Sequence, residues 1–308
     1  MKKISSRLFQ IILVLVLSQS CSRDDSVQVP EEENPVNEEI MRIPLVVHVI
    51  HSGQDIGEES NLSEERIKRQ IEILNEDFRR KPGTRGFNTH IDGADSKIEF
   101  VLAKQAPDGT PFNGINRIDS TLVKVDILGY GPNHYAQYAY WNPEEYINIW
   151  TTPLPRSTEC LALGLATGPD VDLPGIQHLA IPQPGDAEGI LVSWIHFGES
   201  DIECHARHGR TLTHEMGHYL GLLHTWGGST CEFNDYCDDT PAVDIPVYGR
   251  TAFQGCQGEM VQIENYMNWS HDDVMNMFSK DQIARMRYVL THHQGRNSLL
   301  HSKALENP

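Results

Sequence analysis

Residues 213–224 read Thr213-His214-Glu215-Met216-Gly217-His218-Tyr219-Leu220-Gly221-Leu222-Leu223-His224, which is the pattern H-E-x-x-H-x-x-G-x-x-H. Residues four apart on a helix share one face, so His214 and His218 can offer two imidazole nitrogens to one metal ion beside Glu215. Gly221 lets the backbone turn out of the helix, because a residue without Cβ adopts the left-handed conformation at little cost, and His224 can then return as a third ligand. Three protein ligands and one open position suit a catalytic zinc ion. The pattern therefore predicts a helix that carries most of a zinc site.

The first five residues of this pattern can also occur in a helix that binds no metal. The pentad H-E-x-x-H arises by chance in helices, and a histidine on an apolar face is often a hydrogen-bonded core residue. The additional Gly221 and His224 at fixed offsets argue against coincidence. The histidine pairs at 205 and 208 and at 292 and 293 have no third partner at a suitable spacing, and we expect them at the surface.

Length and composition set further limits. A chain of 308 residues with 39% hydrophobic and 22% charged residues can bury a sizeable core. Its net charge of -18, without clustered Lys and Arg, excludes a nucleic-acid partner. The excess of carboxylates serves solubility, and it also suits Ca²⁺, which prefers oxygen ligands.

The N-terminus predicts export. Residues 1–21 combine early lysines with an apolar stretch at 8–17 that is too short to span a bilayer, as in a cleaved signal peptide. The stretch Leu17-Ser18-Gln19-Ser20-Cys21 resembles a bacterial lipobox, with Ser18 as a departure, so Cys21 is a candidate for lipidation. Ordinary secretion is the alternative. Residues 22–41 are polar, acidic and Pro-containing, which predicts a disordered tether before a domain at 42–308.

Periodicity predicts an α+β fold for residues 42–308. A helix with Ser63 as N-cap carries apolar residues at helical spacing, and a last helix begins at Ser279 with a capping box to Gln282. Thr211 is a plausible N-cap for the helix of the histidines. Residues 227–262 are rich in Gly, Asp, Cys and Pro, which predicts a loop-built lower part. Strands are expected at 42–52, 98–103, 146–154, 178–181 and 189–197, the last as an edge that could pair with an extended peptide.

Several motifs outside the histidine pattern resemble one family. Asn265-Tyr266-Met267-Asn268 is similar to the Met-turn of the metzincin metalloproteases. More narrowly, Gly209-Arg210-Thr211-Leu212-Thr213, Asp239-Thr240-Pro241 and Met275-Asn276-Met277-Phe278 resemble the pappalysin, or cytophagalysin, family. The resemblance covers residues 43–287. It implies a twisted mixed sheet with a long backing helix, a helix that binds zinc, and a loop-rich lower part that ends in a helix.

The resemblance also implies roles for single residues. His214, His218 and His224 would bind zinc, and Glu215 would act as general base and then acid. Met267 would form an apolar floor under the metal. Related proteases have a tyrosine two residues after this methionine, whereas this chain has Trp269. An indole donates one hydrogen bond but cannot act as a phenol, so oxyanion stabilisation from this position is in doubt.

Family members hold calcium in the loop after the zinc helix. The similarity runs through Asp235, Asp239 and Thr240, so the implied calcium ligands are Asp235, either Asp238 or Asp239, and the carbonyl of Thr240. The alternative is a solvated acidic loop with Asx turns.

Five cysteines follow Cys21, so at least one has no partner within the chain. Cys231 with Cys256 resembles a family disulfide, whereas a second family cysteine near Val274 is absent. A pair of Cys160 with Cys204 is possible, which would leave Cys237 free, but the sequence does not determine this connectivity.

The resemblance implies a zinc-dependent endopeptidase that acts on extracellular proteins or peptides. Asp273 matches a position that lines the pocket for the residue after the cut in some family members, which favours Arg or Lys there; a surface or capping aspartate is the alternative. A different class of function is a zinc-containing surface lipoprotein that binds proteins without cleaving them. The retained Glu215 argues against it, because a purely structural zinc site does not use that carboxylate.

Overall fold

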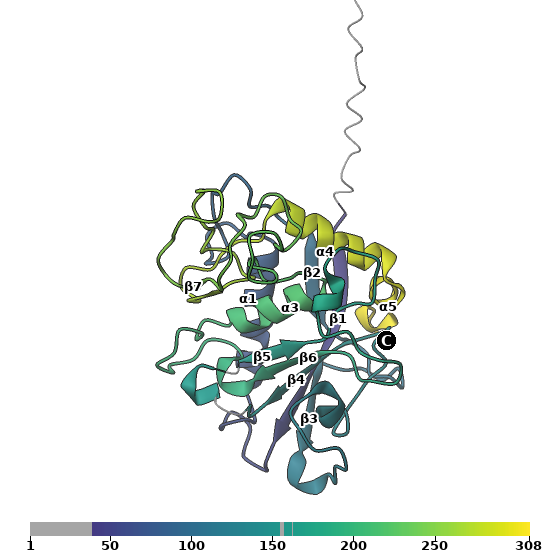
Figure 1. The fold of residues 1–308 in the computed structure, drawn as a ribbon. Helices are drawn as coiled ribbons and strands as arrows, with labels where there is room; N and C mark the ends of the chain where they lie inside the picture. Colours follow the sequence, from purple (N-terminus) through teal and green to yellow (C-terminus); the bar gives the residue numbers. More distant parts are fainter. Residues whose placement is uncertain (1–38, 155–156, 162) are drawn as a thin grey trace, which may run out of the picture. The chain divides into compact units, whose positions relative to one another are not determined.

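The computed structural model describes residues 39–154, 157–161 and 163–308 (Figure 1). The expected signal peptide, the candidate lipobox and residues 22–38 of the expected tether lie outside these described residues. The first strand, β1, starts at Met41, one residue before the expected start of the domain. Within the described ranges, no helix is both long enough and apolar enough to cross a bilayer.

The central strand β1 (Met41–His51) is buried on both faces of a sheet. Its alternate residues Ile43, Leu45, Val47 and Val49 face the main core, whereas Val46 and Ile50 belong to separate clusters. This alternation follows from the period of two in a strand. A run of β-branched residues without polar interruption, apart from His48, is typical of a strand covered on both sides.

The sheet has the strand order β2-β1-β4-β6-β5, and β3 also pairs with β1. All pairs are parallel except β5 with β6, which is antiparallel. The predicted α+β fold with a mixed sheet is confirmed. The strands are β2 (Ile98–Leu102), β3 (Ile115–Asp119), β4 (Ile147–Thr152), β5 (Gly164–Ala166), β6 (Ile190–Ser193), β7 (Tyr248–Gly249) and β8 (Trp269–Ser270).

Two strand predictions need correction. Residues 178–181 are not a strand, because a 3-10 turn (Ile176–His178) and a loop occupy this part of the chain. The strand expected at 189–197 is shorter, and β6 lies between β4 and β5 rather than at the edge. The edge next to the histidines is β5, which is not predictable from the sequence because a three-residue Gly-Leu-Ala segment has no detectable period.

Helices α1 and α3 cover one face of the sheet. Helix α1 (Glu64–Phe78) starts at Ser63, whose side chain accepts a hydrogen bond from the amide of Arg66, as predicted. Helix α3 (Arg210–Tyr219) contacts α1, β5 and β6. Figure 1 shows α3 between the strands of the sheet and the yellow helix α4. The histidine helix therefore lies in the main core of the protein.

The chain after α3 is mostly loops, as predicted, and ends in helices. Helix α4 (Lys280–His292) begins at Ser279 with the predicted capping box to Gln282. The remaining elements are the helices α2 (Pro132–Tyr135) and α5 (Gln294–Leu299) and the 3-10 turns η1 (Ser120–Leu122), η2 (Ser157–Glu159), η3 (Ile176–His178), η4 (Trp194–His196) and η5 (Lys303–Leu305).

Candidate metal centre

The N-terminal end of α3 is capped from another segment. The N-cap residue is Gly209, with φ of 80°, and it has no side chain to accept the first amides. Instead, Asp272 Oδ2 accepts hydrogen bonds from the amides of His208 at 2.8 Å and Arg210 at 3.3 Å. Thr211 lies inside the helix, so its prediction as N-cap is wrong. A carboxylate at this end stabilises the helix, because the free amides carry partial positive charge.

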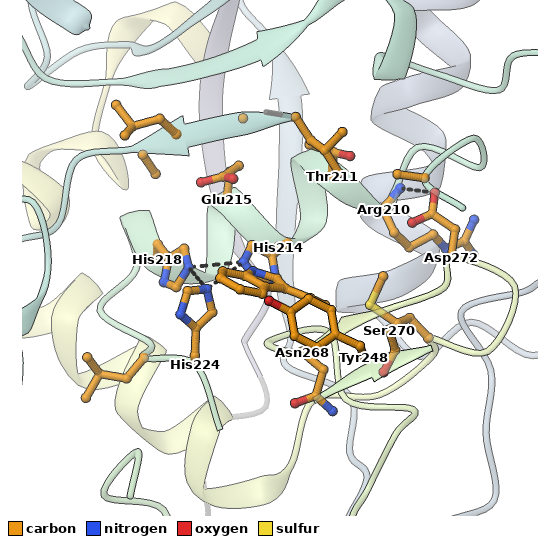
Figure 2. Close-up of a pocket in the computed structure, with 18 of the residues that line it drawn as sticks. Arg210, Thr211, His214, Glu215, His218, His224, Tyr248, Asn268, Ser270 and Asp272 are labelled. Carbon is orange, nitrogen blue, oxygen red and sulfur yellow. Dashed lines mark hydrogen bonds between the residues drawn. The ribbon is translucent and has the colours of Figure 1, made fainter. Parts of the chain in front are cut away.

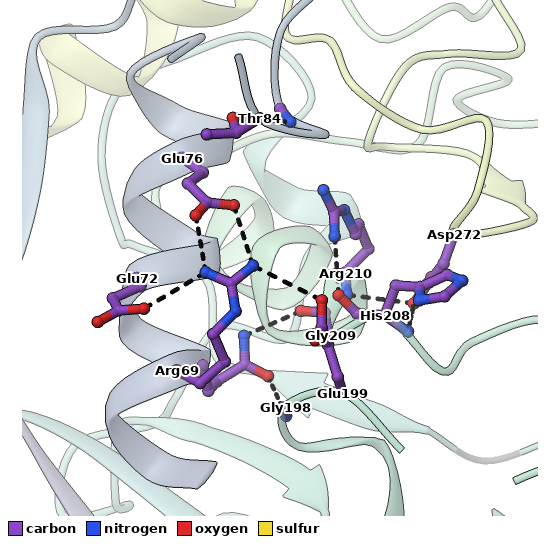
Figure 3. Close-up of polar contacts among 12 residues, drawn as sticks. Arg69, Glu72, Glu76, Thr84, Gly198, Glu199, His208, Gly209, Arg210 and Asp272 are labelled. Atoms are coloured by element: carbon purple, nitrogen blue, oxygen red, sulfur yellow. Dashed lines mark hydrogen bonds and ion pairs between the residues drawn. The ribbon is translucent and has the colours of Figure 1, made fainter. Parts of the chain in front are cut away.

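Figure 3 shows Asp272 beside His208 and Arg210 at this end of α3. Helix α1 holds the same end through buried polar side chains. Gln70 donates to the carbonyl of Gly209 at 3.0 Å. Asp77 forms a buried ion pair with Arg210 at 3.1 Å and accepts from the hydroxyl of Thr213 at 2.7 Å. Burial raises the pKa of Asp77, whereas Arg210 opposes that shift. These contacts hold the residue before His214 against α1.

The turn that ends α3 is held by two arginines from the C-terminal helices. Gly221 has φ of 90°, as its predicted role requires. Arg285 in α4 donates to the carbonyl of Gly221 at 2.7 Å. Arg296 in α5 is fully buried, donates to the carbonyl of Tyr219 at 3.4 Å, and lies 3.6 Å over its ring. Cations at the C-terminal end of a helix complement its free carbonyls.

The structure brings the three predicted histidines together (Figure 2). The Nε2 atom of His214 lies 3.1 Å from that of His218 and 3.2 Å from that of His224, and the last two are 3.1 Å apart. A tetrahedral zinc ion with nitrogen ligands at about 2.0–2.1 Å separates them by about 3.3–3.4 Å. The three nitrogens therefore fit one zinc ion.

Hydrogen bonds on the far side of two rings direct Nε2 toward the centre. His214 Nδ1 lies 2.7 Å from the carbonyl of Tyr266, and His218 Nδ1 lies 2.8 Å from that of Leu222. A carbonyl can only accept, so Nδ1 carries the hydrogen and Nε2 keeps its lone pair. Burial lowers the pKa of His214 to about 3 and of His218 to about 4, and burial also lowers that of His224. The imidazoles are therefore neutral at pH 7, which is the form that binds metal.

Substitution of Gly221 tests the geometry of this turn. We expect Gly221→Ala to lower the free energy of unfolding by about 1–3 kcal/mol, because alanine at this positive φ is strained. The new Cβ would also lie 2.8 Å from Val289. Because the turn leads to His224, zinc affinity should fall as well. Urea unfolding and zinc titration measure both effects, and Gly258→Ala, at φ of 91° in open space, controls for backbone strain alone. Equal zinc affinity in the two variants would contradict the expectation.

Met267 packs against the histidine helix α3. It is fully buried, and a Cβ at Gly217 in α3 would collide with its sulfur. Asn265 shapes the turn by accepting from the amide of Met267 at 2.9 Å. The turn also supplies the carbonyl of Tyr266 that orients His214. The methionine thus fills the space beneath the helix face that carries the histidines.

Glu215 lies beside the three histidines and faces the edge strand β5. It is only 8% exposed, and a Cβ at Gly164 in β5 would lie 2.7 Å from its Cγ and 2.8 Å from Oε1. A larger residue at position 164 would therefore displace the carboxylate. Burial raises the pKa of Glu215 to about 8. A divalent cation at the neighbouring nitrogens opposes this shift and favours the carboxylate form.

The histidines and Glu215 open into a cavity of about 650 Å³, which β5, the loop at 178–180 and the segments around 205 and 268–275 also line. Aromatic rings surround His224. The ring of Trp226 stacks on it at 4.3 Å, and Trp269 meets its face edge-on at 5.1 Å. Trp269 therefore lines the same cavity as the three histidines and contacts His224.

Besides Glu215, the acidic residue that lines this cavity is Asp272 rather than Asp273. Asp273 lines an adjoining cavity and forms an exposed ion pair with Arg250 at 2.7 Å. The assignment of Asp273 to the substrate pocket is therefore corrected. The one-residue error arises because residues 272–274 form a turn, which directs the two adjacent carboxylates to different cavities.

The predicted calcium ligands are not gathered at one point. Within the described residues, Asp235, Asp238 and Asp239 do not form a group of three ligand atoms within 4.8 Å of one another. Asp239 caps α4, accepting from the hydroxyl of Ser279 at 2.6 Å and the amide of Asp281 at 3.0 Å. Asp238 is exposed. Asp235 is buried and accepts from the hydroxyl of Thr240 at 2.6 Å.

The structure pairs four of the five cysteines outside the expected signal peptide. Disulfides join Cys160 to Cys204 and Cys231 to Cys256. Cys237 is free and buried. The pairing implied by the resemblance and the possible second pairing are both present.

Comparisons with known proteins agree with this geometry. The Peptidase_M43 family, described as pregnancy-associated plasma protein-A, matches residues 132–291, more than half of the chain. The chain belongs to this family. The fold of this chain is that of the metzincin-type zinc metalloproteases, which its sequence motifs resemble.

The similarity to individual relatives covers more of the chain than the family match does. An extracellular metalloprotease of Arthroderma benhamiae is 27% identical over 267 residues, which cover 84% of this chain and 75% of that protein. Mature mirolysin of Tannerella forsythia, solved with a cleaved peptide, has a TM-score of 0.71 and 30% identity, over 88% of this chain and 99% of that chain. Mirolysin with a bound compound gives the same TM-score and identity, over 88% and 100%.

This Peptidase_M43 chain is therefore a metalloendopeptidase with a catalytic zinc ion, and its substrates are peptides or proteins. The comparisons do not favour the alternative of a protein that binds without cleaving. Three further residues line the cavity although no motif in the sequence points to them: Gly164, Asp272 and Tyr248. No local pattern could have found them, because each belongs to a segment that only tertiary packing brings to α3.

Proposed function

We propose that the chain is an exported endopeptidase that hydrolyses extracellular proteins at a zinc ion held by His214, His218 and His224, with Glu215 as general base. The observation that carries the proposal is the convergence of three Nε2 atoms within 3.1–3.2 Å in a cavity that Glu215 also lines. The relatives named extracellular metalloproteases support export.

The chemistry divides between the metal and one side chain. A zinc ion held by these nitrogens would lower the pKa of a water molecule to about 7 and would polarise the carbonyl of the substrate. Glu215 takes one proton as the water oxygen forms a bond to the carbonyl carbon, and the C=O electron pair moves onto oxygen. Glu215 then gives the proton to the leaving nitrogen as the electron pair on oxygen re-forms C=O and the C–N bond breaks. The products are a carboxylic acid and an amine, and Glu215 is a carboxylate again.

Digestion of a generic protein tests this function. The purified protein is incubated with casein, with and without the zinc chelator 1,10-phenanthroline, and zinc is then restored. We expect fragments that disappear with the chelator and return with zinc. If casein stays intact while a peptide library is cut, the enzyme is a narrow processing protease. If no peptide is cut by zinc-loaded protein, endopeptidase activity is contradicted.

The edge strand β5 provides the place for an extended substrate. Its inner side pairs with β6, and in the described part of the sheet no strand covers its outer side. An extended peptide can add to such an edge through backbone hydrogen bonds. Because Gly164 of β5 lies against Glu215, a bond in that peptide would be brought to the base. If the peptide runs antiparallel to β5, its residues after the cut lie toward Cys160 and Leu161.

The proposed preference for Arg or Lys after the cut rests on Asp272. This buried carboxylate lines the cavity together with Cys160 and Thr211, on the side that an antiparallel peptide reaches after the cut. Burial raises its pKa to about 6. A cationic side chain from the substrate would compensate the cost of burying this charge.

The variant Asp272→Asn tests this preference. We expect kcat/KM for peptides with Arg after the cut to fall by about 10- to 100-fold relative to peptides with Leu there, since a charged hydrogen bond contributes about 1.5–3 kcal/mol. Asp273→Asn, the adjacent aspartate outside the cavity, should leave this ratio unchanged. The ratio also cancels any loss of folded protein that follows from weaker capping of α3. An unchanged ratio for Asp272→Asn would remove the role of this carboxylate.

We also propose a structural calcium ion held by Asp235, by either Asp238 or Asp239, and by the carbonyl of Thr240. Support comes from the buried carboxylate of Asp235, whose pKa burial raises to about 7, since a cation would offset this cost. The calcium chelator EGTA, in buffer with excess zinc, should lower the melting temperature, and added calcium should restore it. The Asp235→Asn variant should not respond. A wild-type melting temperature independent of calcium would contradict the site.

For the N-terminus, we propose a signal with a lipobox at 1–21 that is cleaved just before Cys21, lipid on Cys21 as the first residue of the mature protein, a tether at 22–41, and a catalytic domain at 42–308. The lipobox-like sequence before Cys21 supports the lipid anchor, which would leave the enzyme on the outer membrane or cell surface rather than secreted. Mass spectrometry of the mature protein should find diacylglycerol and a fatty acyl chain on Cys21. The Cys21→Ser variant should appear unlipidated in the medium.

A further inference from the structure

Tyr248 lies in the same cavity as the three histidines and Glu215, although it is not part of any motif recognised in the sequence. The short strand β7 pairs in parallel with β8, which places Tyr248 opposite Trp269. The backbone is fixed on both sides, because the amide of Trp269 donates to Val247 at 3.0 Å and that of His271 donates to Gly249 at 3.1 Å. Val247 is fully buried and anchors the strand.

Ring contacts connect Tyr248 to the metal centre. Its ring lies 5.2 Å from that of Trp269, which lies 5.1 Å from that of His224. Figure 2 shows the ring of Tyr248 directed from its strand toward the histidines. The side chain is 59% exposed, and within the described residues its hydroxyl has no hydrogen-bond partner. The phenol is therefore free to contact a molecule in the cavity.

The other hydroxyl and amide groups of the cavity are not available. The hydroxyl oxygens of Thr211 and Ser270 are buried from solvent. The amide of Asn268 is used, because it donates to Gln262 at 2.7 Å and its oxygen accepts from Thr225. Arg210 is buried against Asp77. The imidazoles of His178 and His205 line the cavity as well, but no ring contact joins them to the three histidines within the described residues.

We propose that Tyr248 donates a hydrogen bond from its phenolic O–H to the oxygen of the scissile carbonyl as negative charge develops there. This rests on the proposed hydrolysis. The phenol keeps its proton throughout, since Glu215 takes the proton of the water and the C=O electron pair moves onto the acceptor oxygen. A positioned donor stabilises this charge more than it stabilises the neutral carbonyl, which raises kcat. Trp269 then serves as the support that holds the phenol beside His224.

The variant Tyr248→Phe tests the proposal, because it removes one oxygen and keeps the ring. We expect kcat to fall by about 100-fold with little change in KM, as for the loss of one donor to an oxyanion. The affinity for a phosphinic peptide, whose tetrahedral phosphinate imitates the attacked carbon, should fall by a similar factor in calorimetry. Zinc content and melting temperature should not change. Tyr130→Phe, a tyrosine of similar exposure (62%) that does not line the cavity, is the matched control.

A chemical measurement on the wild type provides an independent test. Bound phosphinic peptide should slow nitration of Tyr248 by tetranitromethane and leave that of Tyr130 unchanged, as read by peptide mass spectrometry. Unchanged kcat and phosphinic affinity in Tyr248→Phe, unprotected Tyr248, or loss of activity together with zinc would each overturn the proposal. If the wild type itself cleaves no peptide, the proposed function has failed instead.

Discussion

We expect the Glu215→Ala variant to lose peptide hydrolysis by about 10³- to 10⁴-fold and to keep one zinc ion per chain. The size follows from the contribution of a positioned general base that also acts as the acid. No other carboxylate on the cavity can replace it, because Asp272 accepts the amides that start α3. Zinc content should persist, since the three Nε2 atoms converge without help from Glu215.

This expectation requires kinetics and metal analysis on one preparation. The kcat for a peptide substrate is measured beside zinc content by atomic emission. Glu58→Ala, an exposed glutamate away from the cavity, should behave as wild type in both. If Glu215→Ala cleaves peptides at a similar rate, another group accepts the proton. If activity and zinc fall together, Glu215 acts in metal binding rather than in proton transfer.

The second large effect concerns His224, which the chain supplies only after leaving α3. We expect the zinc affinity of His224→Ala to fall by more than about 100-fold. Loss of a residue that only hydrogen-bonds to a metal ligand lowers the affinity by about 10- to 100-fold, and this variant removes a direct ligand. Hydrolysis should be lost as well. Where zinc is 100 times its Kd, binding adds about 2.7 kcal/mol to the stability of the folded state. A chelator should therefore lower the melting temperature of the wild type and change that of His224→Ala much less.

Competition with a chromophoric zinc chelator measures this affinity. The exposed His301 offers a control, and its alanine variant should keep the affinity and the chelator response of the wild type. A stoichiometric zinc ion of unchanged affinity in His224→Ala would disprove the three-histidine site. Such a result would leave His214 and His218 as the only histidine ligands and would require a ligand from another segment.

The metal centre depends on segments far from it in sequence. Helix α1 and Asp272 fix the start of α3, whereas Arg285 and Arg296 fix the turn after it. Arg296 also pairs with Glu188, just before β6, at 2.6 Å. The sheet, the histidine helix and the C-terminal helices therefore meet at one turn. Arg296 lies beyond residues 132–291, so the family match does not include this contact.

Features that depend on local order along the chain were predictable. The spacing of the three histidines, Glu215 and Gly221 specifies a helix, a left-handed turn and a returning ligand, and the structure has all three. The β-branched period of β1 and the N-cap of α1 were found for the same reason. Each of these depends on residues within a few positions of one another, where steric and hydrogen-bonding preferences act directly.

Other features were decided only by tertiary structure. Edge strand β5 exists because β6 offers it a partner, and Thr211 lies inside α3 because Asp272 caps the helix from another segment. Of two adjacent aspartates, the turn at 272–274 selects which one faces the cavity. Tyr248 reaches the histidines only through pairing of β7 with β8. Contacts between distant segments depend on how the whole core packs, and no short stretch of sequence contains that information.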